Sequence, residues 1–284
     1  MNAENLIAID THVHIEPEPS GNAAEQAAKK YFGDSGASIK RADMAEYYRS
    51  RKIGCVVFSV DETLTGRPQV PNEEVGKFAA DNSDCIMAFA SVNPMRGKAA
   101  VDEAERLVKT GLFRGFKLHP PLMGFHSNDR AAYPFYEVMN AHKLPVVFHT
   151  GHSGIGTGMP GGGGVHLKYG NPMDIDDVAV DFPDMKIILA HPSFPWQDEA
   201  ISVCLHKPQV YIDLSGWSPK YFAPILVQYM NSLLKKKMLF GSDYPLITPD
   251  RWMADFEQLK VKDEVRPLIL KENAMRLFGL GASA

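Results

Sequence analysis

The stretch that decides the fold is Leu6-Ile7-Ala8-Ile9-Asp10-Thr11-His12-Val13-His14, an apolar run that ends in a polar motif. Side chains of an extended strand alternate between two faces, so Asp10, His12 and His14 are predicted to point the same way. Two neutral imidazoles at this spacing can share one divalent ion. A lone histidine more often has an ordinary structural role, so the motif gains meaning only if other strands supply further ligands.

Seven more short apolar runs follow the first, and they are typical of strands that are buried on both faces. They cover residues 55–60, 86–92, 115–119, 146–149, 187–190, 210–214 and 238–241. The segments between them have helical spacing over 39–52, 72–81, 99–110, 132–142, 173–181, 197–206, 219–234 and 249–259. A last amphipathic stretch, 271–278, is expected to pack against the barrel. Several helices follow a capping residue and a proline, as at Thr248-Pro249.

Eight alternating β and α units predict an α/β fold, a closed (β/α)8 TIM barrel that forms one domain over residues 1–284. An open doubly wound sheet is the alternative. It is disfavoured because a His-x-His motif stands where a glycine-rich dinucleotide turn would follow the first strand. Rim insertions are expected at about 16–38 and 150–170. The second contains the glycine run 161–164, which fits either a flexible surface loop or a lid that a substrate approaches closely.

Composition excludes several classes of partner. The 284 residues include 30 Lys and Arg against 34 Asp and Glu, a net charge of −4 that gives no footprint for nucleic acid or for a basic membrane patch. The three cysteines are far apart in apolar stretches and are expected to be reduced. No apolar run approaches a membrane span. We therefore expect a cytoplasmic enzyme with a small-molecule substrate, no nucleic acid or membrane partner, and a homo-oligomer as an open option.

Polar residues stand where the apolar runs end, and in a barrel these positions meet at one rim. They are His12, His14, Lys117, His119, His149, His191 and Asp243. A catalytic zinc site needs about three protein ligands and an open position for water. His12, His14 and His149 supply nitrogen donors, and Asp243 can bind the ion or accept a proton from its water.

The remaining rim residues leave alternatives open. His191 is either a further ligand or an acid/base that acts on the substrate, and the second role is favoured because four ligands are already assigned. Lys117 and His119 share one face of their strand. Lys117 needs an anion, which is a substrate group, Asp243 or a structural partner. A carbamylated Lys117 that bridges two metals is a further option, but a single metal is favoured.

The chain resembles the amidohydrolase superfamily, in particular the amidohydrolase-2 branch that includes aminocarboxymuconate-semialdehyde decarboxylase. The motifs that carry the likeness are Ile9-Asp10-Thr11-His12-Val13-His14, Gly115-Phe116-Lys117-Leu118-His119-Pro120, Val147-Phe148-His149-Thr150-Gly151, Leu189-Ala190-His191-Pro192 and Phe240-Gly241-Ser242-Asp243-Tyr244-Pro245. The resemblance implies a distorted TIM barrel in which His12, His14, His149 and Asp243 bind one divalent ion, zinc or alternatively manganese. His191 then corresponds to the strand-six histidine of the family, a catalytic residue or second-metal ligand.

Hydrolases, hydratases and non-oxidative decarboxylases share this constellation, so the resemblance leaves the reaction open. The leading hypothesis is hydrolysis of a small carboxylated or aromatic-derived carbonyl substrate, such as a lactone, amide or β-ketothioester, by metal-activated water. Lys117 or His119 would stabilise the oxyanion and His191 would protonate the leaving group. Trp196, Trp217 and Tyr244 could form an apolar wall for the substrate. The alternative is decarboxylation of an aromatic or muconate-type acid at the same metal site, and a non-catalytic barrel is the least favoured reading.

Overall fold

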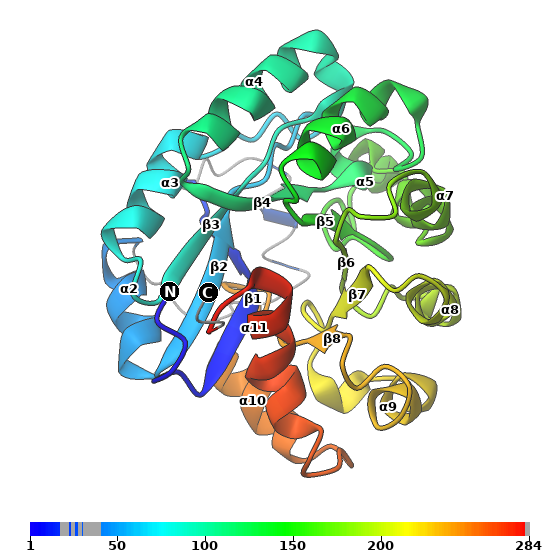
Figure 1. Cartoon of the computed structure of the whole chain (residues 1–284). Helices are drawn as coiled ribbons and strands as arrows, with labels where there is room; N and C mark the ends of the chain where they lie inside the picture. The colour runs from blue at the N-terminus through cyan, green and yellow to red at the C-terminus, as the bar shows by residue number, and fades with distance from the viewer. Residues whose placement is uncertain (18–22, 24–25, 28–29, 31–40, 282–284) are drawn as a thin grey trace.

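Eight parallel strands curve into a nearly closed barrel in the computed structural model of the chain (Figure 1). The structure describes residues 1–17, 23, 26–27, 30 and 41–281. Each strand pairs with the next in chain order: β1 (Ala8–His14), β2 (Ile53–Phe58), β3 (Ile86–Ala90), β4 (Phe113–Leu118), β5 (Val146–His149), β6 (Ile187–Ala190), β7 (Val210–Asp213) and β8 (Met238–Leu239). The predicted (β/α)8 TIM barrel in a single domain is confirmed.

Helices surround the barrel, and most of them connect one strand to the next (Figure 1). They are α2 (Arg41–Ser50), α3 (Asn72–Asp81), α4 (Lys98–Lys109), α5 (Pro120–Met123), α6 (Tyr133–Ala141), α7 (Met173–Asp181), α8 (Gln197–His206), α9 (Pro224–Met230), α10 (Pro249–Glu257) and α11 (Asn273–Phe278). The predicted cap before α10 is present, because the Thr248 side chain accepts a hydrogen bond from the Arg251 N–H. Such a cap satisfies one of the backbone donors left free at a helix start.

The strands separate two apolar layers. Side chains that face the barrel axis, such as Ile9, Val56 and Phe89, pack with one another and with α11. Side chains on the opposite face, such as Val13 and Phe116, pack under the surrounding helices. Burial on both faces explains why the strands read as continuous apolar runs in the sequence.

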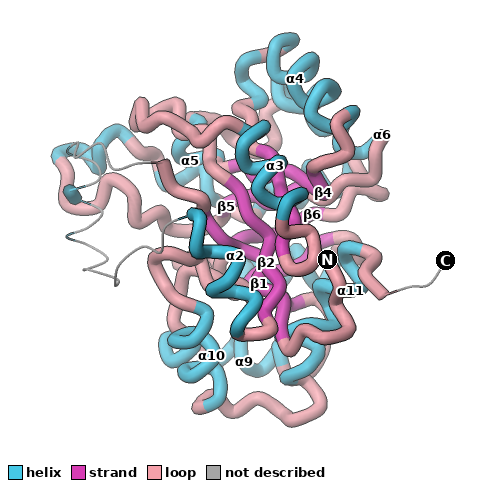
Figure 2. Tube along the Cα trace, turned by 90° about the vertical axis from the view of Figure 1, so that its left-hand side faces the viewer, coloured by secondary structure: helices cyan, strands magenta, loops and turns pink. Residues whose placement is uncertain are grey.

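Helix α11 closes the end of the barrel at which the strands begin. Its residues Ala274 and Leu277 belong to the inner apolar layer. The Lys271 ammonium donates to the Leu6 carbonyl at 2.7 Å, just before β1. In Figure 2 the N-terminus and α11 lie at the same end of the strands. The expectation that the last amphipathic stretch packs against the barrel is therefore confirmed.

The seam between β8 and β1 closes the barrel with few regular sheet bonds, because β8 has only two residues. Instead, the Thr11 N–H and hydroxyl both donate to the Phe240 carbonyl at 2.9 Å. Further along, the Asp243 N–H donates to the His12 carbonyl at 3.0 Å, and the His14 N–H donates to the Tyr244 carbonyl at 2.8 Å. The seam therefore joins the first strand to the residues just after the last one.

Strand β1 contains an irregularity that corrects one sequence prediction. Its pairing with β2 advances from Asp10 to Val13 while the partner strand advances only from Cys55 to Val57. One extra residue in β1 is a β-bulge, which breaks the alternation of side chains. As a result Asp10 bonds Tyr48 of α2, outside the barrel, whereas His12 and His14 face the rim. The prediction that all three share one face was wrong for Asp10.

Several element boundaries also differ from the predictions. The predicted helix 219–234 is a 3-10 turn, Pro219–Tyr221, followed by α9, because Pro224 has no N–H to donate and the preceding Ala223 is extended. The short helix α5 was not predicted. A π-helical turn, Leu268–Glu272, precedes α11.

Of the two predicted rim insertions, only the second lies wholly within the described residues. The insertion at 16–38 lies for most of its length outside the described residues. The segment 150–170 follows β5 and contains two 3-10 turns, Pro160–Gly164 and Leu167–Gly170. Gly161, Gly162 and Gly163 all have φ between 59° and 62°, a left-handed conformation that favours glycine. The glycines thus allow the positive φ angles of this turn. The use of the segment as a lid stays a prediction.

Within the described part of the chain, no helix is both long enough and apolar enough to cross a membrane.

Candidate metal centre

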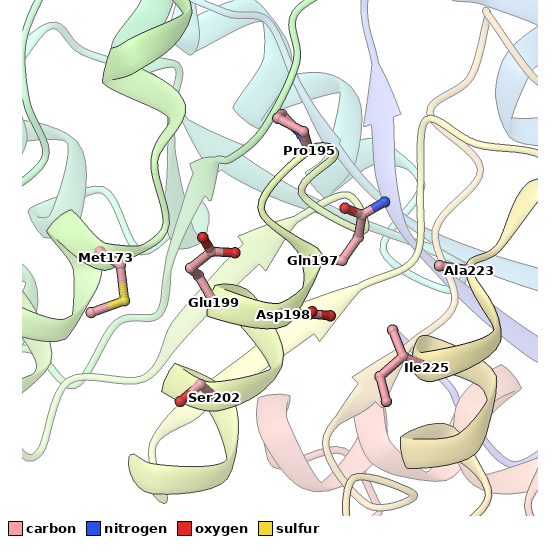
Figure 3. Close-up of a pocket in the computed structure, with 8 residues that line it drawn as sticks. All are labelled: Met173, Pro195, Gln197, Asp198, Glu199, Ser202, Ala223 and Ile225. Atoms are coloured by element: carbon pink, nitrogen blue, oxygen red, sulfur yellow. The ribbon is translucent and has the colours of Figure 1, made fainter.

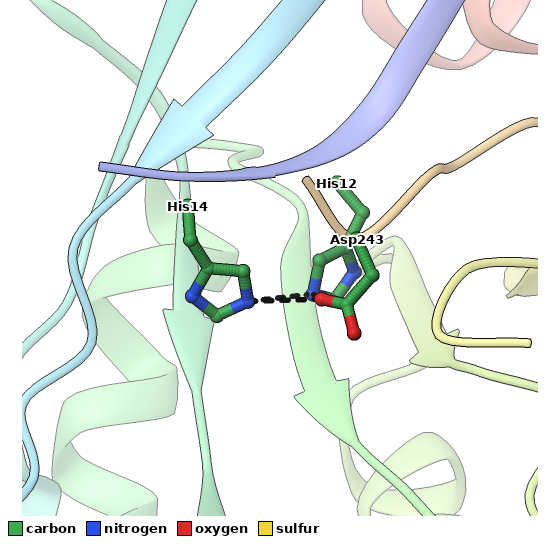
Figure 4. Close-up of side chains that lie close together, drawn as sticks. All are labelled: His12, His14 and Asp243. Carbon is green, nitrogen blue, oxygen red and sulfur yellow. Dashed lines mark hydrogen bonds and ion pairs between the residues drawn. The ribbon is translucent and has the colours of Figure 1, made fainter. Parts of the chain in front are cut away.

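His12, His14 and Asp243 come together at the seam, where β1 and the turn after β8 end (Figure 4). The Asp243 Oδ1 atom lies 3.1 Å from His14 Nε2 and 3.3 Å from His12 Nε2. The two Nε2 atoms are themselves 3.3 Å apart. Residues separated by more than 200 positions thus present three potential ligand atoms to one point, as the sequence analysis predicted for these three residues.

These distances fit a shared cation. Ligands bound at about 2.0–2.1 Å lie roughly 2.8–3.4 Å from one another in octahedral or tetrahedral coordination. The His12 Nδ1 atom lies 2.6 Å from Asp213 Oδ2, and this bond places the ring proton on Nδ1. The His12 Nε2 lone pair is thereby left as an acceptor, which faces the Lys117 ammonium at 3.2 Å and could instead bind a cation shared with Asp243.

The protonation equilibria of these groups agree with a cation site. Burial lowers the pKa of His12 well below its ordinary value, and the nearby Lys117 charge lowers it further. Burial alone would raise the pKa of Asp243, but its hydrogen bond with His14 and the charges of His12 and His191 outweigh this and lower it. At neutral pH the centre thus holds a neutral imidazole and an ionised carboxylate, the forms that bind metals.

His149, the fourth predicted ligand, is not part of this group of three and is linked to it through His191, whose ring centroid lies 5.0 Å from that of His12. Its Nδ1 atom is 3.0 Å from His191 Nε2. Its Nε2 atom is buried, and the described residues offer it no hydrogen-bond partner. A buried polar atom without a partner calls for an explanation such as an ion or a water. The orphaned Nε2 therefore fits a ligand atom, and the assignment of His149 as a ligand stays a prediction.

The side chains of Lys117, in β4, and His119, just after it, lie close to the same group of residues. The Lys117 ammonium is fully buried and lies 3.2 Å from His12 Nε2. Burial lowers its pKa to about 8, although Asp213 and Asp243 oppose this shift. The His119 ring stacks on the His149 ring with centroids 3.8 Å apart. Both residues thus touch predicted ligands, and their roles in catalysis stay predictions.

His191 is fixed by the residues that follow β7. Its Nδ1 atom lies 2.9 Å from the Ser215 hydroxyl, and a Cβ on Gly216 would come within 2.5 Å of the same nitrogen. Gly216 has a φ of 74°, a backbone conformation that residues other than glycine rarely adopt. His191 itself has a positive φ of 74°, and Asp243 has one of 69°. Such conformations concentrate at functional sites, where the surrounding structure holds them in place.

The three predicted substrate-binding aromatics occupy different environments. Trp217 is half-buried and its ring lies 5.6 Å from that of Phe194, which is exposed. Trp196 is half-buried at the start of α8. Tyr244 is buried, and its ring packs against Tyr47 and Tyr48 of α2 rather than beside the ligands. The three assignments stay predictions.

Sequence reasoning assigned no role to Asp213 and Ser215, although both position predicted site residues. Asp213 holds His12, and Ser215 holds His191 while its own N–H donates to Asp213 Oδ1 at 2.7 Å. Asp213 stands where the seventh apolar run becomes polar. Treating every polar residue at the end of an apolar run as a candidate site residue would therefore have identified Asp213.

A separate open pocket of about 550 Å3 lies on the outside of the barrel (Figure 3). It is lined by the start of α8, with Gln197, Asp198 and Glu199, and by residues that begin α7 and α9. None of the predicted site residues lines it. The candidate centre and this pocket are therefore different places on the molecule.

Comparisons with known proteins support the fold. The sequence matches the amidohydrolase family over residues 9–280. No protein of curated function matches it significantly. A TIM-barrel protein of uncharacterised function from Bordetella bronchiseptica is 25% identical, with 96% of this chain and 98% of that one covered and a TM-score of 0.76.

Two further solved structures share the fold at lower identity. A dihydroxybenzoic acid decarboxylase from Polaromonas sp. JS666, with bound manganese and the inhibitor 2-nitroresorcinol, is 16% identical, with 100% of this chain and 98% of that one covered and a TM-score of 0.69. A probable 2-pyrone-4,6-dicarboxylic acid hydrolase from Acinetobacter baumannii, with bound citric acid, is 17% identical, with 96% and 100% covered and a TM-score of 0.65.

Proposed function

The chain belongs to the amidohydrolase family, and from this premise we propose that it is a metal-dependent hydrolase of a small carboxylated or aromatic-derived carbonyl compound. Lactones, amides and β-ketothioesters are the substrate types in view. The observation that carries the proposal is the convergence of His12, His14 and Asp243, whose ligand atoms lie within 3.3 Å of one another. The orphaned Nε2 of His149 is a further candidate ligand atom.

His12, His14, His149 and Asp243 would hold the ion. Three imidazole nitrogens and one carboxylate suit zinc, and manganese is the alternative. A divalent cation bound there polarises a carbonyl and lowers the pKa of water toward neutrality. Asp243 would bind the ion or accept a proton from water, and its lowered pKa keeps the carboxylate ionised for either role.

The other buried groups have roles that follow from their positions. Lys117 and His119 can donate hydrogen bonds to an oxygen on which negative charge develops. His191, oriented by the Ser215 hydroxyl, would protonate the leaving group. A role of His191 as a further ligand is the alternative, since its Nε2 atom already contacts His149.

A second candidate function is non-oxidative decarboxylation of an aromatic or muconate-type acid. The likeness to a manganese-bound dihydroxybenzoic acid decarboxylase over the full chain favours it. In that reaction the same residues would bind a carboxylate or phenolate beside the ion, and an acid such as His191 would protonate the ring carbon.

Metal analysis coupled to a substrate screen tests both candidates. We expect about one equivalent of zinc or manganese in purified protein, measured by inductively coupled plasma mass spectrometry. The metal-loaded protein is then offered lactones, amides and β-ketothioesters in one arm and aromatic acids in the other, with carbon dioxide release recorded. Turnover in the first arm alone supports hydrolysis, and carbon dioxide release alone replaces it with decarboxylation. Protein that binds no divalent ion would contradict the metal centre itself.

We further infer a small molecule as the partner of this site. A cytoplasmic location and a homo-oligomeric state stay predictions, and light scattering on the purified protein tests the second.

A further inference from the structure

Asp10 is a buried carboxylate that the proposed mechanism does not use. The bulge in β1 turns it away from His12 and His14, and its side chain has no exposure. Four donors surround it: the Ser242 hydroxyl at 2.5 Å, the Ser242 N–H at 2.8 Å, the Tyr48 hydroxyl at 3.1 Å and the His12 N–H at 3.2 Å.

Two of these donors belong to the backbone that carries the predicted ligands. One is the N–H of His12 itself, and the other is the N–H of Ser242, the neighbour of Asp243. Asp10 therefore bonds to both sides of the seam at the point where the ligands leave it. Backbone bonds also cross the seam here, from the Asp243 N–H to the His12 carbonyl and from the His14 N–H to the Tyr244 carbonyl, and Asp10 adds side-chain bonds to both segments.

The conformation of Asp243 needs such support. Its φ of 69° is one that residues other than glycine adopt only when surrounding contacts impose it. The Ser242 hydroxyl donates to Asp10 and accepts the Tyr244 N–H at 3.1 Å, so the turn on both sides of Asp243 is anchored through Asp10.

We propose that Asp10 is a positioning residue that holds His12 and Asp243 at ligand distance, with Ser242 and Tyr48 as its partners. The inference rests on the proposed metal centre and adds a residue to it. Asp10 does not touch the ion or the substrate. It acts by fixing the two backbone segments from which the ligands project, and supporting residues of this kind typically change metal affinity by 10–100-fold when they are replaced.

The test separates positioning from simple stabilisation of the fold. Asp10→Asn keeps the size of the side chain and one acceptor oxygen, but its NH2 group would face two of the hydrogen-bond donors that Asp10 now accepts from. Tyr48→Phe removes one donor and keeps the aromatic ring that packs near Tyr244. Thr11→Val is the matched control, because it deletes a buried hydroxyl that crosses the same seam to Phe240 without bonding Asp10.

Zn2+ affinity is measured by competition with a chelator at a temperature where every variant is folded, and the visible spectrum of the Co2+-substituted protein reports the ligand geometry. We expect Asp10→Asn to weaken Zn2+ binding by 10–100-fold and to change the Co2+ spectrum. Tyr48→Phe should weaken Zn2+ binding by a smaller factor. If Asp10→Asn does not fold, Tyr48→Phe alone tests the proposal. Thr11→Val should lower the melting temperature and leave both metal readouts at their wild-type values.

The outcomes distinguish this inference from the proposed function. Wild-type protein that binds the ion, with Asp10→Asn and Tyr48→Phe no different from Thr11→Val in affinity and spectrum, would overturn the positioning role alone. Wild-type protein that binds neither Zn2+, Co2+ nor Mn2+ would overturn the metal centre and this inference together.

Discussion

The two halves of the candidate centre are built differently. In the seam half, formed by His12, His14 and Asp243, the side chains lie within 3.3 Å of one another and Asp213 holds the far side of the His12 ring. In the open half, formed by His119, His149 and His191, two buried ring nitrogens have no partner among the described residues. Leaving a buried donor or acceptor unsatisfied costs about 1–3 kcal/mol each. The seam half is therefore preorganised, whereas the open half has unpaired ring nitrogens that a ligand would complete.

Replacing His12 by alanine should have the largest effect, because it removes a proposed ligand from the seam half and leaves the buried Asp213 Oδ2 atom without its His12 partner. We expect loss of the bound ion and a fall in kcat/KM of more than about 100-fold, since even outer partners of metal ligands typically cost 10–100-fold. Metal content and steady-state kinetics measure both effects. His206→Ala, an exposed change on α8, should leave both values at wild type. Full metal content in His12→Ala would refute the seam half as a metal site.

His149→Ala tests whether the open half completes the coordination. Because its orphaned Nε2 is the proposed fourth ligand atom, we expect zinc affinity to fall about 10–100-fold. His119→Ala is the matched variant, since it removes the imidazole stacked on His149 without removing a proposed ligand. Competition with a chelator should show the larger loss in His149→Ala. Equal losses in both variants would contradict the assignment of His149.

Gly216→Ala should disturb the contact between the halves, because the added Cβ would lie 2.5 Å from His191 Nδ1 and 3.2 Å from Asp243 Oδ2. Gly124→Ala is a close control: it also has a positive φ, of 78°, but a Cβ there meets nothing within 4 Å. Both variants should lose about 1–2 kcal/mol of stability in chemical unfolding. Only Gly216→Ala should also lower kcat, by up to about 100-fold. Similar kinetics in the two variants would show that the close approach is unimportant.

Ser215→Ala should have the smallest effect and separates the two roles of His191. Losing the hydrogen bond to its Nδ1 removes about 1 kcal/mol, so kcat should fall several-fold to about 10-fold. Metal content should stay at the wild-type value if His191 acts as an acid or base. Reduced zinc affinity with little change in kcat at saturating zinc would instead make His191 a ligand.

Much of the fold was predictable because it depends on local patterns. The apolar runs, the polar residues at the ends of β1, β4, β5 and β6 and after β8, and the cap at Thr248 are all readable from neighbouring residues. The helix predicted over 219–234 was wrong at Pro224 for an equally local reason, since a proline there ends the hydrogen-bonded pattern.

The site was less predictable because its details are set by contacts between distant segments. The bulge that separates Asp10 from His12 depends on how β1 pairs with β2 and with the turn after β8. An ideal strand predicts strict alternation and cannot reveal it. The partnership of Asp213 with His12 likewise joins opposite ends of the chain. Proximity of this kind follows from barrel closure and not from the sequence of either strand.

The seam has a consequence for the order of events when the protein folds. Its bonds join residues 229 and 232 positions apart, among the longest separations the chain allows. Contacts between distant segments are slow to form because a large loop must close first. In the proposed centre, His12 and His14 are made first, but Asp243 follows β8, the last strand, so the three ligands can come together only after the barrel closes. We expect metal capture to be a late event, and so a kinetic marker that the barrel is complete.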